Sequence, residues 1–279
     1  MNTKYRLIPE DYKEICGKKL YRIEALKDSG DVKAGDLGGY IESENNLSHD
    51  GYAWVYDNAC VRDNACVRDN ACVDKNAWIR DNACVGGDAC VGGDACVGGD
   101  ACVRDNAWVR DNAVVCGNAY VGDDACVRDN ACVRDNAVVC NNARVGGNAR
   151  VRGKAMIRDN ACVRDNAIIG NNAIICDNAI IRGNAIIRDN AIIRDNAIIC
   201  DNTSWLIVGP LGSRDDFTTF FSGEYGIYVS CGCFYGSISE FEKAVEKTHA
   251  GTKHEKDYKL AIELAKSRIV TAEVNENEI

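Results

Sequence analysis

The stretch RDNACVRDNACV, residues 62–73, is part of a six-residue repeat that continues without a break as far as Asn202. Alanine occupies every sixth position from Ala53 to Ala197, which gives 25 consecutive hexads. Val or Ile follows two positions after each alanine, and the next positions are usually Arg or Gly, then Asp or Gly, then Asn or Asp. Such a repeat predicts a fold that grows by stacking equal units rather than by enlarging one globular core.

The hexad pattern indicates short strands separated by corners. Because six is a multiple of two, each slot of the hexad keeps its face from one hexad to the next. The alanine and the Val or Ile therefore share a face, and the alanine slot never enlarges, which fits a site with room for one methyl group. The Asp-Asn pair supplies turn chemistry, since Asn tolerates left-handed backbone angles and both side chains can bond nearby backbone. We expect a solenoid whose bore is lined by these apolar residues.

This pattern resembles the hexapeptide-repeat left-handed parallel β-helix, whose motif combines an aliphatic residue with a small residue at this spacing. The resemblance implies a left-handed coil of three hexads. About eight coils spaced roughly 4.8 Å apart would then form a prism ~40 Å long. Pentapeptide-repeat mimics of DNA form a similar solenoid, but their period is five. The predicted fold class is mainly β, with an N-terminal β cap at 1–52, the solenoid at 53–202 and an α+β domain at 203–279.

The two ends do not repeat. The N-terminal segment is expected to form short strands, and Ile41 and Leu47, six apart, place the entry to the solenoid near Ile41. After Asn202 we expect strands and then two helices. Ser239 is the expected N-cap of the first helix, with Glu242 completing a capping box. The second helix is expected to bury four residues at helical spacing, which are Tyr258, Ile262, Ala265 and Ile269.

Ten cysteines occupy the outward slot between the alanine and the Val or Ile. With three hexads per coil, Cys66, Cys84 and Cys102 form one column, and Cys72 and Cys90 form another. A soft-metal or redox ladder is one interpretation. The other is that cysteine acts here as a small hydrophobe, and the absence of CxxC spacing or interleaved His favours it. Asp88, Asp94 and Asp100 of the three ACVGGD hexads occupy the ordinary Asn slot, so calcium is not expected. No metal and no cofactor are predicted.

Isoleucine replaces cysteine in the outward slot of the last hexads, which makes all three faces of two coils apolar. An apolar surface of this size rarely stays exposed on a soluble protein. Either the C-terminal domain covers it or a second chain does, and we favour a homo-oligomer. Hexapeptide-repeat proteins commonly form trimers, so the resemblance implies a trimer. The predicted interface residues are Ile168, Ile174, Ile180, Ile186, Ile192 and Ile198.

The C-terminal domain carries the predicted ligand site. Arg214 lies between two turns, and Arg suits the recognition of phosphate or carboxylate. Alternatively, it pairs with Asp215 or Asp216 and the domain is only a cap. Cys231 and Cys233, expected on one strand, have no visible partner pair for a metal. The predicted binding residues are Ser213, Arg214, Asp215, Thr218, Thr219, Tyr228 and Phe234.

The hexapeptide fold is best known from acyltransferases, in which a histidine beside the prism acts as general base. The 25 hexads contain neither a histidine nor an insertion. The three histidines of the chain, His49, His249 and His254, all lie outside the array. No catalytic residue is therefore predicted, and His49 is the candidate if the protein is an acyltransferase.

The segments around the array add a second resemblance. GDVKAGDLGGYIESENNLSHDG before the hexads, and GPLGSRDD and CGCF after them, are similar to a group of bacterial and bacteriophage hexapeptide-repeat proteins. This resemblance lends no catalytic residues. We predict a non-enzymatic binding or scaffold protein, with a phage counter-defence protein that sequesters a nucleotide-like molecule as the first alternative.

Charge and hydropathy exclude some partners. The formal net charge is −9, which argues against binding to a nucleic-acid backbone. The sequence contains no run of about 18 apolar residues, so a membrane span is not expected. The start, MNTKYRLIPEDYKEICG, does not have the pattern of a secretory signal, so a location in the bacterial host cytoplasm with reduced cysteines is expected. A small phosphorylated ligand or a protein is the expected partner.

Overall fold

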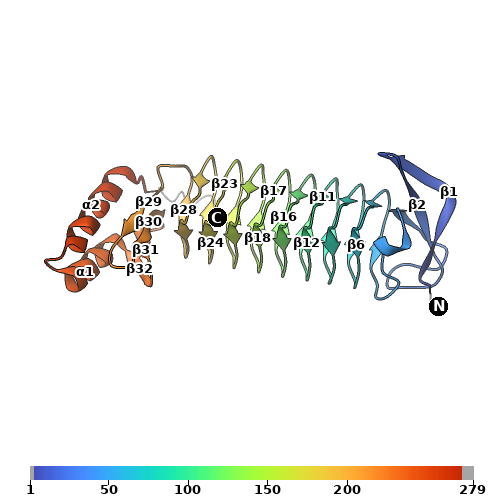
Figure 1. Ribbon diagram of the computed structural model, residues 1–279, viewed down its shortest axis with the longest axis horizontal. Coiled ribbons are helices and arrows are strands. Elements are labelled where there is room, and N and C mark those ends of the chain that lie inside the picture. The colour runs from blue at the N-terminus through green and yellow to red at the C-terminus, as the bar shows by residue number, and fades with distance from the viewer. Residues whose placement is uncertain (1–2, 272–279) are drawn as a thin grey trace.

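The computed structural model describes residues 3–271, and the end of the predicted C-terminal domain, 272–279, lies outside the described residues. The protein is a rod (Figure 1). A small antiparallel sheet closes one end, stacked coils form the shaft, and a domain with two helices closes the other end. No helix within 3–271 has the length and apolar character needed to cross a membrane.

The shaft consists of 25 two-residue strands in three parallel sheets. One sheet contains β5 (Cys60–Val61), β8 (Trp78–Ile79), β11 (Cys96–Val97), β14 (Val114–Val115), β17 (Cys132–Val133), β20 (Arg150–Val151), β23 (Ile168–Ile169) and β26 (Ile186–Ile187). The second contains β4 (Trp54–Val55), β7 (Cys72–Val73), β10 (Cys90–Val91), β13 (Trp108–Val109), β16 (Cys126–Val127), β19 (Arg144–Val145), β22 (Cys162–Val163), β25 (Ile180–Ile181) and β28 (Ile198–Ile199). The third contains β6 (Cys66–Val67), β9 (Cys84–Val85), β12 (Cys102–Val103), β15 (Tyr120–Val121), β18 (Val138–Val139), β21 (Met156–Ile157), β24 (Ile174–Ile175) and β27 (Ile192–Ile193).

The register confirms a coil of three hexads. Cys90 pairs with Trp108, eighteen residues further along the chain, and the same step separates all neighbouring strands of the shaft. The backbone N–H of Cys90 donates to the carbonyl oxygen of Ala107 at 2.9 Å. Nine strands stack in the second sheet, so the shaft makes about nine turns. The expected parallel β-solenoid is confirmed.

The bore is filled by the alanine and Val or Ile slots. Ala119 is 1% exposed and Val121 is 0% exposed, and the other residues of these two slots are buried in the same way. The side chains of the slot between them point outward. Odd and even positions of a strand face opposite sides, so each hexad has an apolar side in the bore and a variable side outside.

The corners are made by the fifth residue of the hexad. This residue has a positive φ in every hexad from Asp57 (φ 53°) to Asp195 (φ 57°). Where it is not glycine, it is usually Asp rather than the Asn that the sequence pattern suggested. The Asn that follows bonds the next coil instead, as when Asn82 Nδ2 donates to Asp100 Oδ1 at 2.8 Å. The Asp also bonds the next coil, since Asp81 Oδ2 accepts from the N–H of Gly99 at 2.9 Å.

The N-terminal sheet continues the shaft. Its strands are β1 (Tyr5–Ile15), β2 (Lys18–Ala25) and β3 (Leu37–Ile41), followed by a 3-10 turn, η1 (Glu44–Asn46). The strands β1, β2 and β3 are antiparallel, and β3 pairs in parallel with β5. Ile41 is 0% exposed and Leu47 bridges to Val67, which confirms that the solenoid begins near Ile41.

The C-terminal domain is one antiparallel sheet covered by two helices. The elements are β29 (Trp205–Leu211), β30 (Asp216–Gly223), β31 (Gly226–Cys231), β32 (Phe234–Ser237), α1 (Ile238–His249) and α2 (Lys253–Arg268). Successive side chains along β30 point to opposite faces of the sheet. Phe221 packs against the end of the solenoid core, while Phe220 packs among residues of the helices. The four residues expected on the buried face of the second helix are all buried.

The predicted capping box is displaced by two residues. Ser237, not Ser239, is the N-cap of α1, and Glu240, not Glu242, completes the box. Ser237 Oγ accepts from the N–H of Glu240 at 3.3 Å. The prediction was wrong because β32 delivers the chain to the helix at Ser237, so the second serine already lies inside the first turn.

Substitution of Asp111 tests the corners. Asp111 is exposed and has a φ of 61°, a conformation that costs a β-branched residue about 1–2 kcal/mol. We expect Asp111→Val to lower the melting temperature followed by circular dichroism. Asp111→Gly is the matched control, because it loses the same carboxylate without the steric penalty. Equal losses in the two variants would contradict this account of the corner.

Lys4 gives the N-terminal cap a pH-dependent stability. It is 1% exposed, its Nζ donates to the carbonyl oxygen of Ala53 at 2.8 Å, and burial lowers its pKa from 10.5 to about 8. Between pH 8 and 10.5 the unfolded chain therefore binds more protons at this residue than the folded chain does. We expect the free energy of unfolding to rise with pH in this window, by up to about 1.4 kcal/mol per pH unit. Denaturation at several pH values should show a smaller rise in Lys4→Met, and an unchanged rise would exclude Lys4 as the source.

Candidate ligand site in the C-terminal domain

A hollow of about 440 Å³ lies between the tip of the β29–β30 turn, the β31–β32 turn and the two helices. Its wall is apolar where the sheet meets the helices and polar where it opens. The apolar lining comes from Leu211, Phe234, Phe241, Ala244, Val245 and Tyr258. The polar and sulfur-bearing lining comes from Ser213, Arg214, Asp216, Cys231, Cys233, Thr248 and His249. Hollows of this size and composition commonly hold small molecules in proteins.

Arg214 is a cation in the lining of this hollow, which also contains Asp216. It is exposed on the turn between β29 and β30, with Nη1 beside Gly232 of the opposite turn. Within residues 3–271 it forms no ion pair with Asp215 or Asp216, which was the alternative interpretation of the sequence. A guanidinium with five free donors is therefore available to an anion at the rim.

Polar groups beneath the rim are already bonded to one another. Thr218 Oγ1 donates to Cys231 Sγ at 3.1 Å, and the same sulfur lies 3.6 Å from the Tyr258 hydroxyl. Burial raises the pKa of Tyr258, and its contact with Cys231 raises it further. The hydroxyl therefore stays protonated at neutral pH and can donate or accept at the floor of the hollow.

His249 adds an imidazole that sequence reasoning did not assign to the site. Its ring centroid lies 5.5 Å from that of Tyr258 and 5.7 Å from that of His254. Phe241, Val245 and His249 are spaced by four residues on α1, so they lie on one face of the helix. That spacing could have placed His249 beside the two apolar residues that form the wall.

The residues predicted for ligand binding separate into two groups. Ser213, Arg214 and Phe234 line the hollow, and Thr218 lies under it through Cys231. Asp215 is exposed on the turn with a φ of 47° and does not line the hollow. Cys231 and Cys233 flank a turn between β31 and β32 rather than sharing a strand.

Thr219 and Tyr228 lie on the opposite face of the sheet, toward the solenoid. Thr219 Oγ1 accepts from the backbone N–H of Ile192 at 3.2 Å. Tyr228 stacks on Tyr235 with 5.9 Å between ring centroids. Adjacent strand residues face opposite ways, so Thr218 and Thr219 could not both face one ligand. These two residues attach the domain to the shaft instead.

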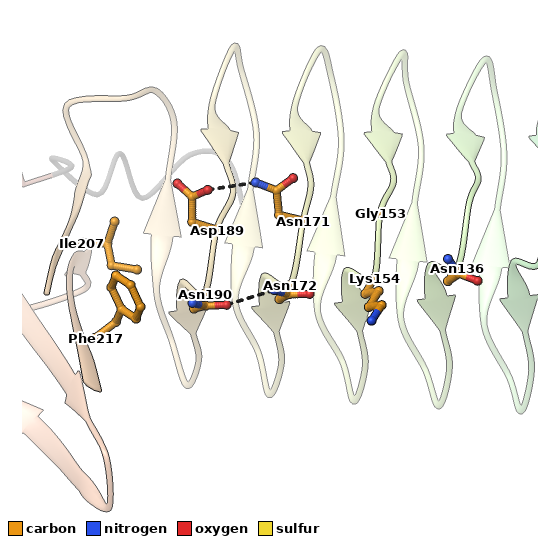
Figure 2. A pocket seen from close by; sticks show the side chains of 9 residues that line it. All are labelled: Asn136, Gly153, Lys154, Asn171, Asn172, Asp189, Asn190, Ile207 and Phe217. Carbon is orange, nitrogen blue, oxygen red and sulfur yellow. Dashed lines mark hydrogen bonds between the residues drawn. The ribbon is translucent and has the colours of Figure 1, made fainter. Parts of the chain in front are cut away.

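A wider groove of about 630 Å³ follows one corner of the solenoid up to the C-terminal sheet (Figure 2). Ile207 and Phe217 face it from the sheet, and Lys154 interrupts its row of amide side chains. Asn171 Nδ2 donates to Asp189 Oδ1 at 2.8 Å, and a hydrogen bond between two asparagine side chains runs parallel to it in the neighbouring row. These side chains thus bond one another between coils, while Lys154, which is exposed, is the cation of this groove.

The remaining predicted residues serve the fold. His49 Nδ1 accepts from the N–H of Lys4 at 3.2 Å, and its ring stacks on Tyr5 at 4.4 Å. Asp88, Asp94 and Asp100 each accept a bond from an Asn of the preceding coil, at 2.8–2.9 Å. The predicted cysteine columns exist, since Cys66 pairs with Cys84 and Cys72 with Cys90.

The six outward isoleucines lie on all three sheets of the last coils. Ile192 is 36% exposed, and the other five are half-buried. Ile186 shares a small hollow with Trp205 and Ile207, so the C-terminal domain lies beside it. Phe221 of that domain joins the core of the solenoid, and Trp205, Ile207, Tyr228 and Tyr235 pack against this core.

Comparison with known proteins adds no assignment. No family model matches this chain. No curated protein is significantly similar to it. Arguments about function therefore depend on the chemistry of the residues described above.

Proposed function

We propose that the protein works by binding, and that the hollow of the C-terminal domain holds a small anionic molecule. The observation that carries this proposal is Arg214, an unpaired guanidinium at the rim of an apolar hollow. Charge-assisted hydrogen bonds from Arg to phosphate or carboxylate are the strong class of polar contact.

The lining favours a ligand with a flat apolar part and one charged group. Phe234, Phe241 and Tyr258 supply aromatic surface, and Ser213 adds a hydroxyl beside Arg214. A nucleotide-like molecule has this combination, with a base to stack and a phosphate for the guanidinium. Sequestration of such a signal by a phage counter-defence protein is one form of this function, which Arg214 and the outward isoleucines support.

The solenoid acts in this proposal as a rigid support. Its hexad pattern supports membership of the hexapeptide-repeat family, and with it a left-handed coil. An acyltransferase is the enzymatic alternative, with His49 as its base. His49 accepts a backbone bond and stacks on Tyr5 in the cap, which favours a structural role. Turnover of acetyl-coenzyme A that is lost in His49→Ala would instead favour the transferase.

Nucleotide titration of the Arg214→Ala variant tests the proposed site. We expect a 5′-mononucleotide such as AMP to bind the parent chain more tightly than inorganic phosphate does, measured by calorimetry. Loss of the guanidinium should weaken nucleotide binding by at least about tenfold, since a hydrogen bond to a charged group contributes about 1.5–3 kcal/mol.

Arg110→Ala is the matched control for this titration. It removes the same charge from an exposed position of the shaft, far from the hollow in sequence. Equal weakening in both variants would mean that general charge, not the site, determines binding. If Arg214→Ala bound nucleotides, sugar phosphates and phosphate as well as the parent, the proposed site would be wrong.

We also propose that the outward isoleucines join copies of the chain, as a trimer. Six isoleucines around two coils form an apolar belt that the fold of one chain leaves half-exposed. Arg144 and Arg150 occupy the same outward slot a coil or two earlier, so the fold itself accepts charge there. The belt is therefore better explained by association than by the stability of the coil.

Lysines placed in the belt test the association. The triple variant Ile168→Lys, Ile174→Lys and Ile180→Lys puts one charge on each sheet, and we expect it to be monomeric by native mass spectrometry while the parent is a trimer. The matched control is Cys126→Lys, Cys132→Lys and Val138→Lys, which charges the same slot on the same three sheets two coils earlier or more. A parent that is monomeric, or a control that dissociates equally, would contradict the interface.

A further inference from the structure

The hexad Ala71–Asn76 departs from the rest of the array. It reads ACVDKN, where the common form is ACVRDN. Asp74 is the only carboxylate in the fourth slot of the 25 hexads, which otherwise holds mostly Arg, Gly or Cys. Slots two and four have the same parity, so Asp74 points outward on the same side as Cys72.

Two cysteines and this carboxylate converge on one spot of the shaft. Cys72 on β7 pairs with Cys90 on β10 in the next coil. The Sγ atoms of both cysteines and a carboxylate oxygen of Asp74 all lie within 4.8 Å of one another. All three residues are partly exposed, so a solute can reach them.

One oxygen of Asp74 lacks a partner. Asp74 Oδ1 is buried and accepts no hydrogen bond from any residue within 3–271. Gly92 in the next coil leaves the space for it, because a side chain at that position would collide with Oδ1. A buried carboxylate oxygen without a donor is costly, and a bound cation would offset that cost.

We propose that Cys72, Asp74 and Cys90 form a binding site for a zinc-class divalent metal ion. Thiolates select zinc over magnesium and calcium, and a carboxylate is an accepted third ligand. Three protein ligands leave the fourth tetrahedral position open to water or an exogenous ligand. Binding displaces the thiol protons of the two cysteines into solvent.

The neighbouring clusters lack this combination. In the Cys66, Cys84 and Cys102 column the fourth slot holds Arg68, Gly86 and Arg104, and Arg104 Nε donates to Cys102 Sγ at 2.8 Å. A cation there would meet a guanidinium. Asp159, Cys176 and Asp177 also converge, but with a single thiol. Their carboxylates accept backbone bonds from the next coil, so they have no unmet acceptor of this kind.

The test converts the hexad Ala71–Asn76 to the common form of the array. Asp74→Arg with Lys75→Asp turns ACVDKN into ACVRDN, which the same array folds elsewhere, and Arg68 above Gly86 shows that an arginine fits over a glycine. The reduced full-length chain is titrated with Co²⁺, followed by thiolate-to-cobalt charge-transfer absorption, and with Zn²⁺ by competition. We expect one ion per parent chain and an affinity at least about tenfold lower in the variant.

The column of Cys66, Cys84 and Cys102, in which Arg68 replaces the aspartate over a glycine, provides the matched control. Cys66→Ser with Cys84→Ser removes a stacked thiol pair of the same geometry and should leave metal affinity unchanged, whereas Cys72→Ser with Cys90→Ser should abolish the charge-transfer band. Circular dichroism without metal verifies that each variant is folded. The proposal is overturned if the parent binds no metal, if the restored hexad binds as tightly as the parent, or if loss of Cys66 and Cys84 removes the band.

Discussion

Every coil of the shaft is joined to the next by backbone hydrogen bonds between residues seventeen apart, such as the one from Cys90 N to Ala107 O at 2.9 Å. This ladder closes only if each coil has the same length, and it brings equal slots into columns. Between the sheets, the bore has room for one methyl group at each alanine and for one Val or Ile beside it. The outward slots are free of this constraint, which is why cysteine, tryptophan, arginine and isoleucine all occur in them.

The architecture could be predicted from the sequence because parity assigns each hexad slot to a face before any tertiary contact is known. The number of hexads per coil was taken from a resemblance and then confirmed by the register of strand pairs. The residue at the left-handed corner and the N-cap of α1 were harder to predict from the sequence. The pattern pointed to Asn for the left-handed corner, but the structure uses Asp, since both residue types tolerate a positive φ and only the ladder to the next coil distinguishes them. The capping box of α1 moved because two serines, Ser237 and Ser239, satisfy the same motif, and the end of β32 decides between them.

The ligand hollow was predictable only in part. Arg214 and Phe234 could be identified by residue type and by their turns. The helical spacing places His249 and Tyr258 on the buried faces of their helices, but it does not show that these faces meet the two turns around one hollow. Thr219 and Tyr228 were assigned to the ligand because polar and aromatic residues on a strand suit binding, but their parity turns them toward the shaft. For the proposed metal cluster, by contrast, the sequence itself carries the signal. Its cysteines follow the ordinary pattern of the array, and the informative signal was the single exchange of arginine for aspartate at Asp74.

The equality of the coils has a consequence for how this rod can change in length. A gain or loss of three hexads would move the C-terminal domain along the axis by one coil, about 4.8 Å, and leave every column in register. A gain or loss of one hexad would instead rotate that domain by a third of a turn relative to the N-terminal sheet. Reach and orientation of the two ends are therefore set by different increments of the same sequence repeat, and each can vary without a change in the core that both share.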